Sequence, residues 1–419
     1  MAESSSISTL SRRHLQKQAP ITEDDEEAQN GTGHTRSSVA TNDIWTRQRK
    51  VSIRNRLSNF TWAWFEATMA TGAMAMLLSQ QAFTFRGLEA IGKLFFILDL
   101  VLFTTFCGLI AFRFIMNPPA LMRSLHHPHE SFYFGAFWVS INFVLYNIEI
   151  YGVPASGPWL IKTLEVCFWI YASCAILVVV FQYHVIFDEE ELPVRDAMPA
   201  WILPAYPFLV LGPFAAALAG NQPTSSAVPI IIGGLLFNGL GWMIAFLMFG
   251  LYIARLVQHE LPDAPKRPGM FVAVGPAAYT SYTLISLGTQ AENVLPAGFL
   301  GITRIPVGDV WKATGVPAGI FFWLLSFWFF ALACVSVATA GKTRFSMQWW
   351  SFVFPQVALC TAGLTIGGAL SSPAVEWVFT IFTIILVAGW LFVGVAHIRA
   401  VTKKQILWPG MDENYEEID

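Results

Sequence analysis

The sequence has few charged residues for its length. Of its 419 residues, 13% are Asp, Glu, Lys or Arg, whereas 55% are hydrophobic. An ordinary soluble domain carries about 25% charged residues, so the shortage excludes that class and favours a chain surrounded largely by lipid. The formal net charge of −3 also gives no sign of the basic surface that nucleic-acid binding requires.

Patterns typical of enzymes and metal sites are also missing. The sequence has no glycine-rich phosphate loop, no zinc-ligand spacing and no dinucleotide-binding fingerprint. Its five cysteines all lie inside apolar runs, as expected of small packing residues rather than a disulfide framework. We therefore expect no enzymatic activity, no cofactor and no metal.

What the sequence does contain is a series of apolar stretches, each long enough to cross a bilayer, which takes about 20 residues. We predict ten of them, at residues 60–79, 90–116, 131–152, 160–187, 199–219, 227–257, 271–290, 310–340, 345–370 and 374–400. The expected fold is an all-α membrane protein of five helical hairpins. Residues 56–402 would form this transmembrane domain, between a disordered cytosolic tail at 1–55 and a cytosolic tail at 403–419.

The distribution of Lys and Arg predicts the orientation. Basic residues gather before the first stretch and in the loops on the same side as both termini, for example Arg123, Arg267 and Lys403, whereas the opposite loops have few. Because cytosolic loops carry the excess of Lys and Arg, both termini are expected in the cytosol.

Helix breakers fall mainly in the odd-numbered stretches. The fifth contains Pro204, Pro207 and Pro213, the seventh Gly275-Pro276 followed by the hydroxyl cluster YTSYT at 279–283, and the ninth Pro355; the first contains Gly72. The even-numbered stretches are mostly uninterrupted. Broken helices are tolerated in membranes where they are buried in protein or line a watery cavity. We expect the odd helices inside, around a central pore, and the even helices outside; the alternative is that the breakers are packing kinks.

Four segments in order resemble the tellurite-resistance/dicarboxylate transporter family, which includes plant slow anion channels, fungal malate permeases and fungal sulfite efflux pumps. They are FTWAWFEATMATGAMAMLL at 60–78, PAWILPAYPFLVLG at 199–212, RPGMFVAVGPAAY at 267–279 and WWSFVFP at 349–355. The first, with the FRGLEAIGKLFFILDL that follows it, is most like the fungal malic acid transport proteins. The resemblance implies five inner helices around a pore, five outer helices and a homotrimer.

The resemblance also implies a gate and a substrate. Phe354 in WWSFVFP stands where the family's pore phenylalanine precedes a proline, and a large apolar side chain in a narrow conduit would form a dewetted constriction. The alternative is that Phe354 only packs between helices. The implied function is transport of malate and related C4-dicarboxylates across the plasma membrane, with membrane lipid as the other partner. The alternatives are a small-anion channel or sulfite efflux pump, and a non-transporting scaffold or sensor.

A dicarboxylate inside the membrane needs hydrogen-bond donors, because burying its charge is costly. Candidate donors on the odd helices are Thr68, Thr71, Asn142, Tyr146, Asn147, Tyr206, Thr280, Ser281, Gln356 and Thr361. Each could instead make an interhelical hydrogen bond. Arg86, just past the first helix on the outer side, could attract or bind a carboxylate at the mouth, or be a solvated arginine.

Two acidic residues interrupt apolar stretches. Glu66 lies in the first stretch and Asp99 in the second. Ionisable residues inside membranes often relay protons, so either could do so in a transporter of protonatable acids. Asp99 is expected on an outer helix, where a structural hydrogen bond is the favoured interpretation.

Overall fold

The computed structural model describes residues 56–127, 130–188 and 192–408, and within these ranges it contains helices and no strand. The all-α fold class is therefore confirmed. The predicted N-terminal tail at 1–55 and residues 409–419 of the predicted C-terminal tail at 403–419 lie outside the described residues, so the disorder expected of the N-terminal tail stays a prediction.

Nine helical segments of the described chain are long and apolar enough to cross a membrane. They are Leu88–Met116, Ser131–Ala155, Pro158–Asp188, Pro199–Ala219, Thr224–Gln258, Ala264–Val294, Val307–Ala338, Met347–Ala369 and Pro373–Thr402. Each overlaps one of the predicted stretches. The first predicted stretch is helical too, but its α-helix α2 (Phe65–Ser79) has only 15 residues. The count of ten spans therefore stays a prediction.

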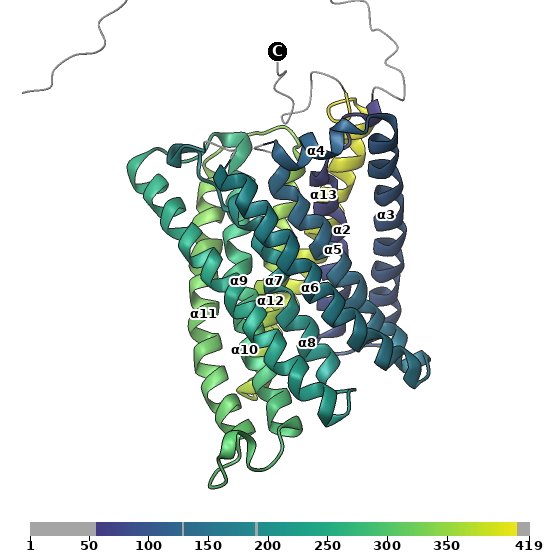
Figure 1. Cartoon of the computed structure of the whole chain (residues 1–419). Coiled ribbons are helices and arrows are strands. Elements are labelled where there is room, and N and C mark those ends of the chain that lie inside the picture. The colour runs from purple at the N-terminus through teal and green to yellow at the C-terminus, as the bar shows by residue number, and fades with distance from the viewer. Residues whose placement is uncertain (1–55, 128–129, 189–191, 409–419) are drawn as a thin grey trace, which may run out of the picture. The chain divides into compact units, whose positions relative to one another are not determined.

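Six α-helices form the inner part of the bundle, and five long helices surround them (Figure 1). The inner helices are α2, α5 (Phe134–Asn147), α7 (Tyr206–Leu209), α8 (Leu211–Ala219), α10 (Val274–Val294) and α12 (Phe354–Ala369). The outer helices are α3 (Leu88–Met116), α6 (Pro158–Asp188), α9 (Thr224–Gln258), α11 (Val307–Ala338) and α13 (Pro373–Thr402). A short helix, α4 (Pro119–His126), follows α3.

The inner helices close into a ring of five segments. Helix α2 packs on α5, α5 on α7 and α8, α8 on α10, α10 on α12, and α12 on α2 again. Each outer helix covers this ring from one side: α3 packs on α2, α6 on α8, α9 on α8 and α10, α11 on α10, and α13 on α12. The odd-inside arrangement expected from the helix breakers is the one observed.

Burial separates the two sets of helices. In the outer spans only 22–39% of the most apolar window is buried, whereas the fifth, seventh and ninth predicted spans are 78–94% buried. The third is 50% buried. Apolar side chains such as Leu177, Leu247 and Phe321 point outward from the outer helices and are largely exposed. An exposed apolar surface on helices of this length is typical of contact with lipid.

Every inner segment enters its α-helix through a short 3-10 helix. These are η1 (Trp62–Trp64), η2 (Ser131–Tyr133), η6 (Pro199–Ala205), η7 (Ala264–Ala273) and η9 (Met347–Phe352). The breakers in the fifth, seventh and ninth predicted helices lie at or near these transitions. Gly72 differs, because α2 continues through it without interruption; the expected break there is wrong. A Cβ at Gly72 would lie 2.7 Å from Asp99 Oδ2 and 2.8 Å from Phe143 Cβ, so glycine is needed for close packing instead.

Candidate functional site

Four aromatic side chains from four inner segments meet inside the ring. Phe354 of α12 lies 5.8 Å from Phe143 of α5, 5.7 Å from Tyr206 of α7 and 5.6 Å from Tyr279 of α10, between ring centroids. We call these four residues the aromatic cluster. Phe354 is only 2% exposed. The cluster therefore fills the space enclosed by these segments at the level where α7 and α12 begin.

Prolines place the cluster by starting or bending the helices that carry it. Pro207 and Pro355 directly follow Tyr206 and Phe354, and Pro276 precedes Tyr279 by one turn. A proline within the first turns of a helix fits the required backbone angle but removes one N–H, which leaves the carbonyl four residues earlier without its usual donor.

Side chains take up the carbonyls that the prolines leave free. The Tyr206 hydroxyl donates to Val272 O at 2.5 Å, four residues before Pro276. Gln356 Nε2 donates to Ser351 O at 2.9 Å, four residues before Pro355. In the same way Asn238 Nδ2 donates to Leu209 O at 2.8 Å, four residues before Pro213. The kinks are thus held by the polar contacts that a bent membrane helix requires.

Gly275 allows Tyr206 to reach this position. A Cβ added at Gly275 would overlap the Tyr206 hydroxyl and come within 2.9 Å of its ring. The Gly275-Pro276 pair therefore serves two purposes: the proline frees the Val272 carbonyl, and the glycine makes room for the tyrosine that binds it.

Most of the predicted donor hydroxyls already donate to the backbone. Thr68 donates to Phe65 O at 2.9 Å, Thr71 to Ala67 O at 2.7 Å and Thr280 to Pro276 O at 2.8 Å. Ser281 donates across to Gly319 O of α11 at 2.7 Å, and Thr361 to Val357 O at 2.8 Å. With Tyr206 also engaged, these side chains offer an anion no free hydrogen in this conformation.

Two buried donors of the inner helices, one of them in the aromatic cluster, are not used in this way. Asn142 Nδ2 and the Tyr279 hydroxyl are buried and have no hydrogen-bond partner. Asn142 shares a helix face with Tyr146, one turn along α5, where the Tyr146 hydroxyl accepts from Gln80 Nε2 at 3.1 Å. Buried unpaired donors are uncommon and need an explanation. Asn142 was among the donors predicted from the sequence and Tyr279 was not, although Tyr279 opens the YTSYT cluster. Its side chain points about 100° away from that of Thr280 around the helix.

The other predicted residues lie in different settings. Gln356 keeps only its Oε1, an acceptor, unpaired, and Asn147 likewise has its Nδ2 bound to Gly72 O and its Oδ1 unpaired. Arg86 is exposed in the segment between α2 and α3, at the opposite end of α2 from Glu66. The structure therefore does not bring Arg86 together with the aromatic cluster.

Both membrane carboxylates are buried. Glu66 lies in the first turn of α2 and is 2% exposed, with Oε2 unpaired. Asp99 of α3 is fully buried against Gly72, and both of its carboxylate oxygens lack a hydrogen-bond partner. The interpretation of Asp99 as a residue that makes a structural hydrogen bond is therefore wrong for this conformation, because no donor on α2 or α5 reaches it.

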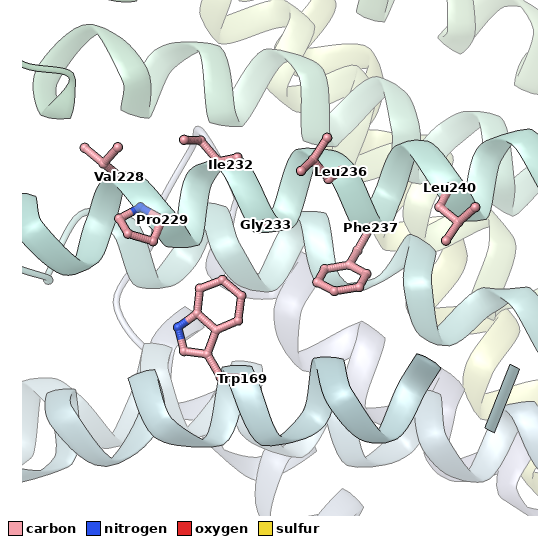
Figure 2. A pocket seen from close by; sticks show the side chains of 8 residues that line it. All are labelled: Trp169, Val228, Pro229, Ile232, Gly233, Leu236, Phe237 and Leu240. Atoms are coloured by element: carbon pink, nitrogen blue, oxygen red, sulfur yellow. The ribbon is translucent and has the colours of Figure 1, made fainter. Parts of the chain in front are cut away.

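An apolar groove lies on the outer surface, between α6 and α9. Figure 2 shows Trp169 of α6 pointing at α9 beneath Gly233, beside Pro229 and Phe237. The groove has a volume of about 600 Å³, and its lining exposes no polar surface. It offers nothing that recognises an anion, so the candidate site is the aromatic cluster and not this groove.

Comparison with known proteins agrees with the fold. Residues 59–398 match the family described as voltage-dependent anion channel. The chain is 31% identical over 368 residues to a Schizosaccharomyces pombe protein named malic acid transport protein, covering 87% of this chain and 83% of the relative. A putative malic acid transport protein of the same yeast is 29% identical over 380 residues, covering 90% and 88%.

A more distant relative has a different named activity. The protein called sulfite efflux pump SSU1 in Arthroderma benhamiae is 27% identical over 346 residues, covering 80% of this chain and 89% of the relative. These matches confirm the resemblance found in the sequence and identify a multi-pass membrane transport protein rather than an enzyme. The chain belongs to the voltage-dependent anion channel family.

Proposed function

We propose that this protein carries malate and related C4-dicarboxylates across the plasma membrane, through a conduit inside the inner ring that Phe354 constricts. The names of the two yeast relatives support the substrate. The observation that carries the proposal is the aromatic cluster, because it puts one large apolar side chain between three others inside a closed ring of helices.

Phe354 acts as the gate in this proposal. Its side chain is apolar and three aromatic rings contact it, so an anion that passes it must give up water, with the Tyr279 hydroxyl as the unused donor among those rings. A narrow apolar constriction of this kind excludes water and ions until the side chain moves. A change of side-chain rotamer at Phe354 would open the passage, with no change in the backbone of the ring.

Neutral donors near the gate hold the carboxylates. Asn142 Nδ2 and the Tyr279 hydroxyl come first, because their hydrogens are unused. A hydrogen bond to a charged group contributes about 1.5–3 kcal/mol. Thr68, Thr71, Tyr146, Tyr206, Thr280, Ser281 and Gln356 stay in the proposed binding set, but most of them must exchange a backbone carbonyl for the substrate. Arg86 has the separate role of attracting anions to the outer mouth.

The second candidate is transport of smaller anions on the same scaffold, favoured by the relative named sulfite efflux pump. Uptake of labelled malate into liposomes that hold the purified protein, driven by a pH gradient, distinguishes the two. We expect saturable malate uptake that unlabelled malate competes away more strongly than sulfite or nitrate. Sulfite or nitrate flux without malate uptake would identify the second candidate instead.

The membrane arrangement is proposed with the function: both termini in the cytosol, the protein in the plasma membrane, and three copies in a homotrimer with one pore each. Tags at either end should be labelled only after permeabilisation of intact cells. The oligomer is checked by the mass of the detergent-solubilised protein. Labelling of a tag on the surface of intact cells would contradict the orientation.

A further inference from the structure

Tyr146 of α5 and Tyr282 of α10 form a second level of side chains inside the inner ring. Each follows a member of the aromatic cluster by three residues, because Phe143 precedes Tyr146 and Tyr279 precedes Tyr282. The inner helices run in the same direction, since an outer helix returns the chain after each of them. The two tyrosines therefore lie about one helical turn beyond the cluster, toward the C-terminal ends of the inner helices.

Tyr282 lies on the face of α10 that meets Tyr206. It follows Gly275 by seven residues, or two turns of an α-helix, and a Cβ added at Gly275 would come within 2.9 Å of the Tyr206 ring. The residue before Tyr282, Ser281, instead donates to Gly319 O of the outer helix α11 at 2.7 Å. The side chain of Tyr282 is therefore directed into the ring.

The two tyrosines meet across the ring, since α7 and α8 separate α5 from α10 around it. Phe143 and Tyr279 already approach each other there, at 6.4 Å between ring centroids. One turn further along, the hydroxyls of Tyr146 and Tyr282 interact. At the end of α2, Gln80 Nε2 donates to the Tyr146 hydroxyl at 3.1 Å. We call Gln80, Tyr146 and Tyr282 the polar layer; it links three of the five inner segments.

The polar layer closes the inside of the ring in this conformation. Tyr146 is fully buried and Tyr282 is 4% exposed, so both rings are shielded from solvent. An anion that moves along the ring must separate the two hydroxyls and pass between them. The tyrosine hydroxyls and the glutamine amide can then donate to it, whereas the side chain of Phe354 cannot.

We propose that the polar layer is a second constriction of the conduit, in series with Phe354, and that it selects among anions. This rests on the proposed function of anion transport. Phe354 excludes ions because its surroundings are dewetted. The polar layer instead exchanges its own hydrogen bonds for hydrogen bonds to the anion, which are stronger when the acceptor is charged. A carboxylate accepts hydrogen bonds more strongly than nitrate does, so the polar layer favours carboxylates.

The first test uses the fact that the higher of two barriers in series sets the rate. Tyr282→Ala alone should leave the nitrate conductance in planar bilayers nearly unchanged, because Phe354 still limits it. Phe354→Ala combined with Tyr282→Ala should conduct roughly tenfold more than Phe354→Ala alone. The matched control combines Phe354→Ala with Tyr171→Ala. Tyr171 of the outer helix α6 is 3% exposed and donates to Trp138 O at 3.0 Å, so this pair should conduct like Phe354→Ala.

The second test keeps the rings and removes only a hydroxyl. Tyr282→Phe in the Phe354→Ala background should lower the ratio of malate to nitrate flux roughly tenfold, because one donor to the carboxylate is lost. Tyr171→Phe in the same background should leave this ratio unchanged.

Either of two results would overturn the second constriction. One is equal conductance of Phe354→Ala with and without Tyr282→Ala. The other is a ratio of malate to nitrate flux that Tyr282→Phe does not change, a variant that keeps the ring and so tests the layer even where Tyr282→Ala fails to fold. Both results leave the proposed function intact, whereas absence of any malate or nitrate flux through the wild-type protein would overturn the function itself.

Discussion

Inner and outer helices of this protein use proline in different ways. Pro229 and Pro317 lie inside α9 and α11, and both outer helices continue through them. Pro276 and Pro355 instead lie where an inner segment changes from a 3-10 helix to an α-helix, and the carbonyls that they free accept hydrogen bonds from Tyr206 and Gln356. The change from 3-10 to α-helix is therefore found where neighbouring side chains donate to the freed backbone groups, which is inside the ring and not at the lipid.

The largest expected effect comes from removing the gate. Phe354→Ala would take away the side chain that three other rings surround, so the dewetted barrier falls. We expect the passive anion conductance of the protein in planar bilayers to rise roughly tenfold or more, a change that needs only about 1.4 kcal/mol of barrier. Selectivity between malate and nitrate should fall at the same time.

The matched control is a buried phenylalanine outside the cluster. Phe106 of α3 is 7% exposed and packs on Phe60, Trp64 and Phe65. Phe106→Ala should lower the yield or thermal stability of the protein without opening it. If Phe354→Ala behaves like Phe106→Ala, with less protein and unchanged conductance, Phe354 is a packing residue and the gate assignment fails.

The next largest effect is on thermal stability, which a Gly→Ala change should lower at an inner helix and not at an outer one. Gly275→Ala would force a Cβ into Tyr206, and overpacking of this kind costs roughly 1–3 kcal/mol. Gly239→Ala on the outer helix α9 meets no atom within 4 Å, and a helical Gly→Ala change there should stabilise by about 0.5–1 kcal/mol. Thermal unfolding in detergent should fall for Gly275→Ala and be unchanged or higher for Gly239→Ala. Equal behaviour of the two variants would mean that the ring tolerates displacement of Tyr206.

Much of this fold could be predicted from the sequence. Stretches of about 20 apolar residues strongly favour a spanning helix, so the predicted bounds lie close to those of the helical segments, as at 199–219. The inner position of the fifth, seventh and ninth helices followed from their prolines and glycines. Gly72 shows the limit of that reasoning, since a glycine serves close packing as readily as a break, and only the position of Asp99 shows which.

Less of the candidate site could be predicted. A hydroxyl in a membrane helix can bind the carbonyl four residues earlier without leaving its own helix, as Thr71 and Thr280 do. The sequence carries no sign of whether it does so. Nor does it show that Tyr206 uses its hydroxyl across the ring, which leaves Tyr279 as the tyrosine of the cluster with an unpaired hydroxyl. Side-chain direction, rather than residue type, selects the donors.

A smaller effect separates free donors from occupied ones. Asn142→Ala and Tyr279→Phe each remove a donor that has no partner in the protein, so each should raise the KM for malate roughly tenfold, from the loss of about 1.5 kcal/mol. Monocarboxylates should be less affected, because they have one carboxylate to satisfy. Thr361→Ala is the matched control: its hydroxyl donates to Val357 O, and its loss should change the KM about twofold at most. A large effect of Thr361→Ala, with none from Asn142→Ala or Tyr279→Phe, would show that the substrate displaces backbone hydrogen bonds instead.

The smallest effect is expected outside the ring. Arg86 is exposed between α2 and α3 and does not lie at the aromatic cluster, so it can attract an anion but not hold it at the gate. Exposed charges act mainly on encounter rates and are screened within about 10 Å at 0.1 M salt. Arg86→Ala should therefore lower kcat/KM for malate about two- to threefold at low salt, and the difference should vanish as salt is raised. Loss of saturable uptake in Arg86→Ala at all salt concentrations would place carboxylate recognition at an arginine of the outer mouth. The inner ring would then not be the part of the protein that binds the substrate.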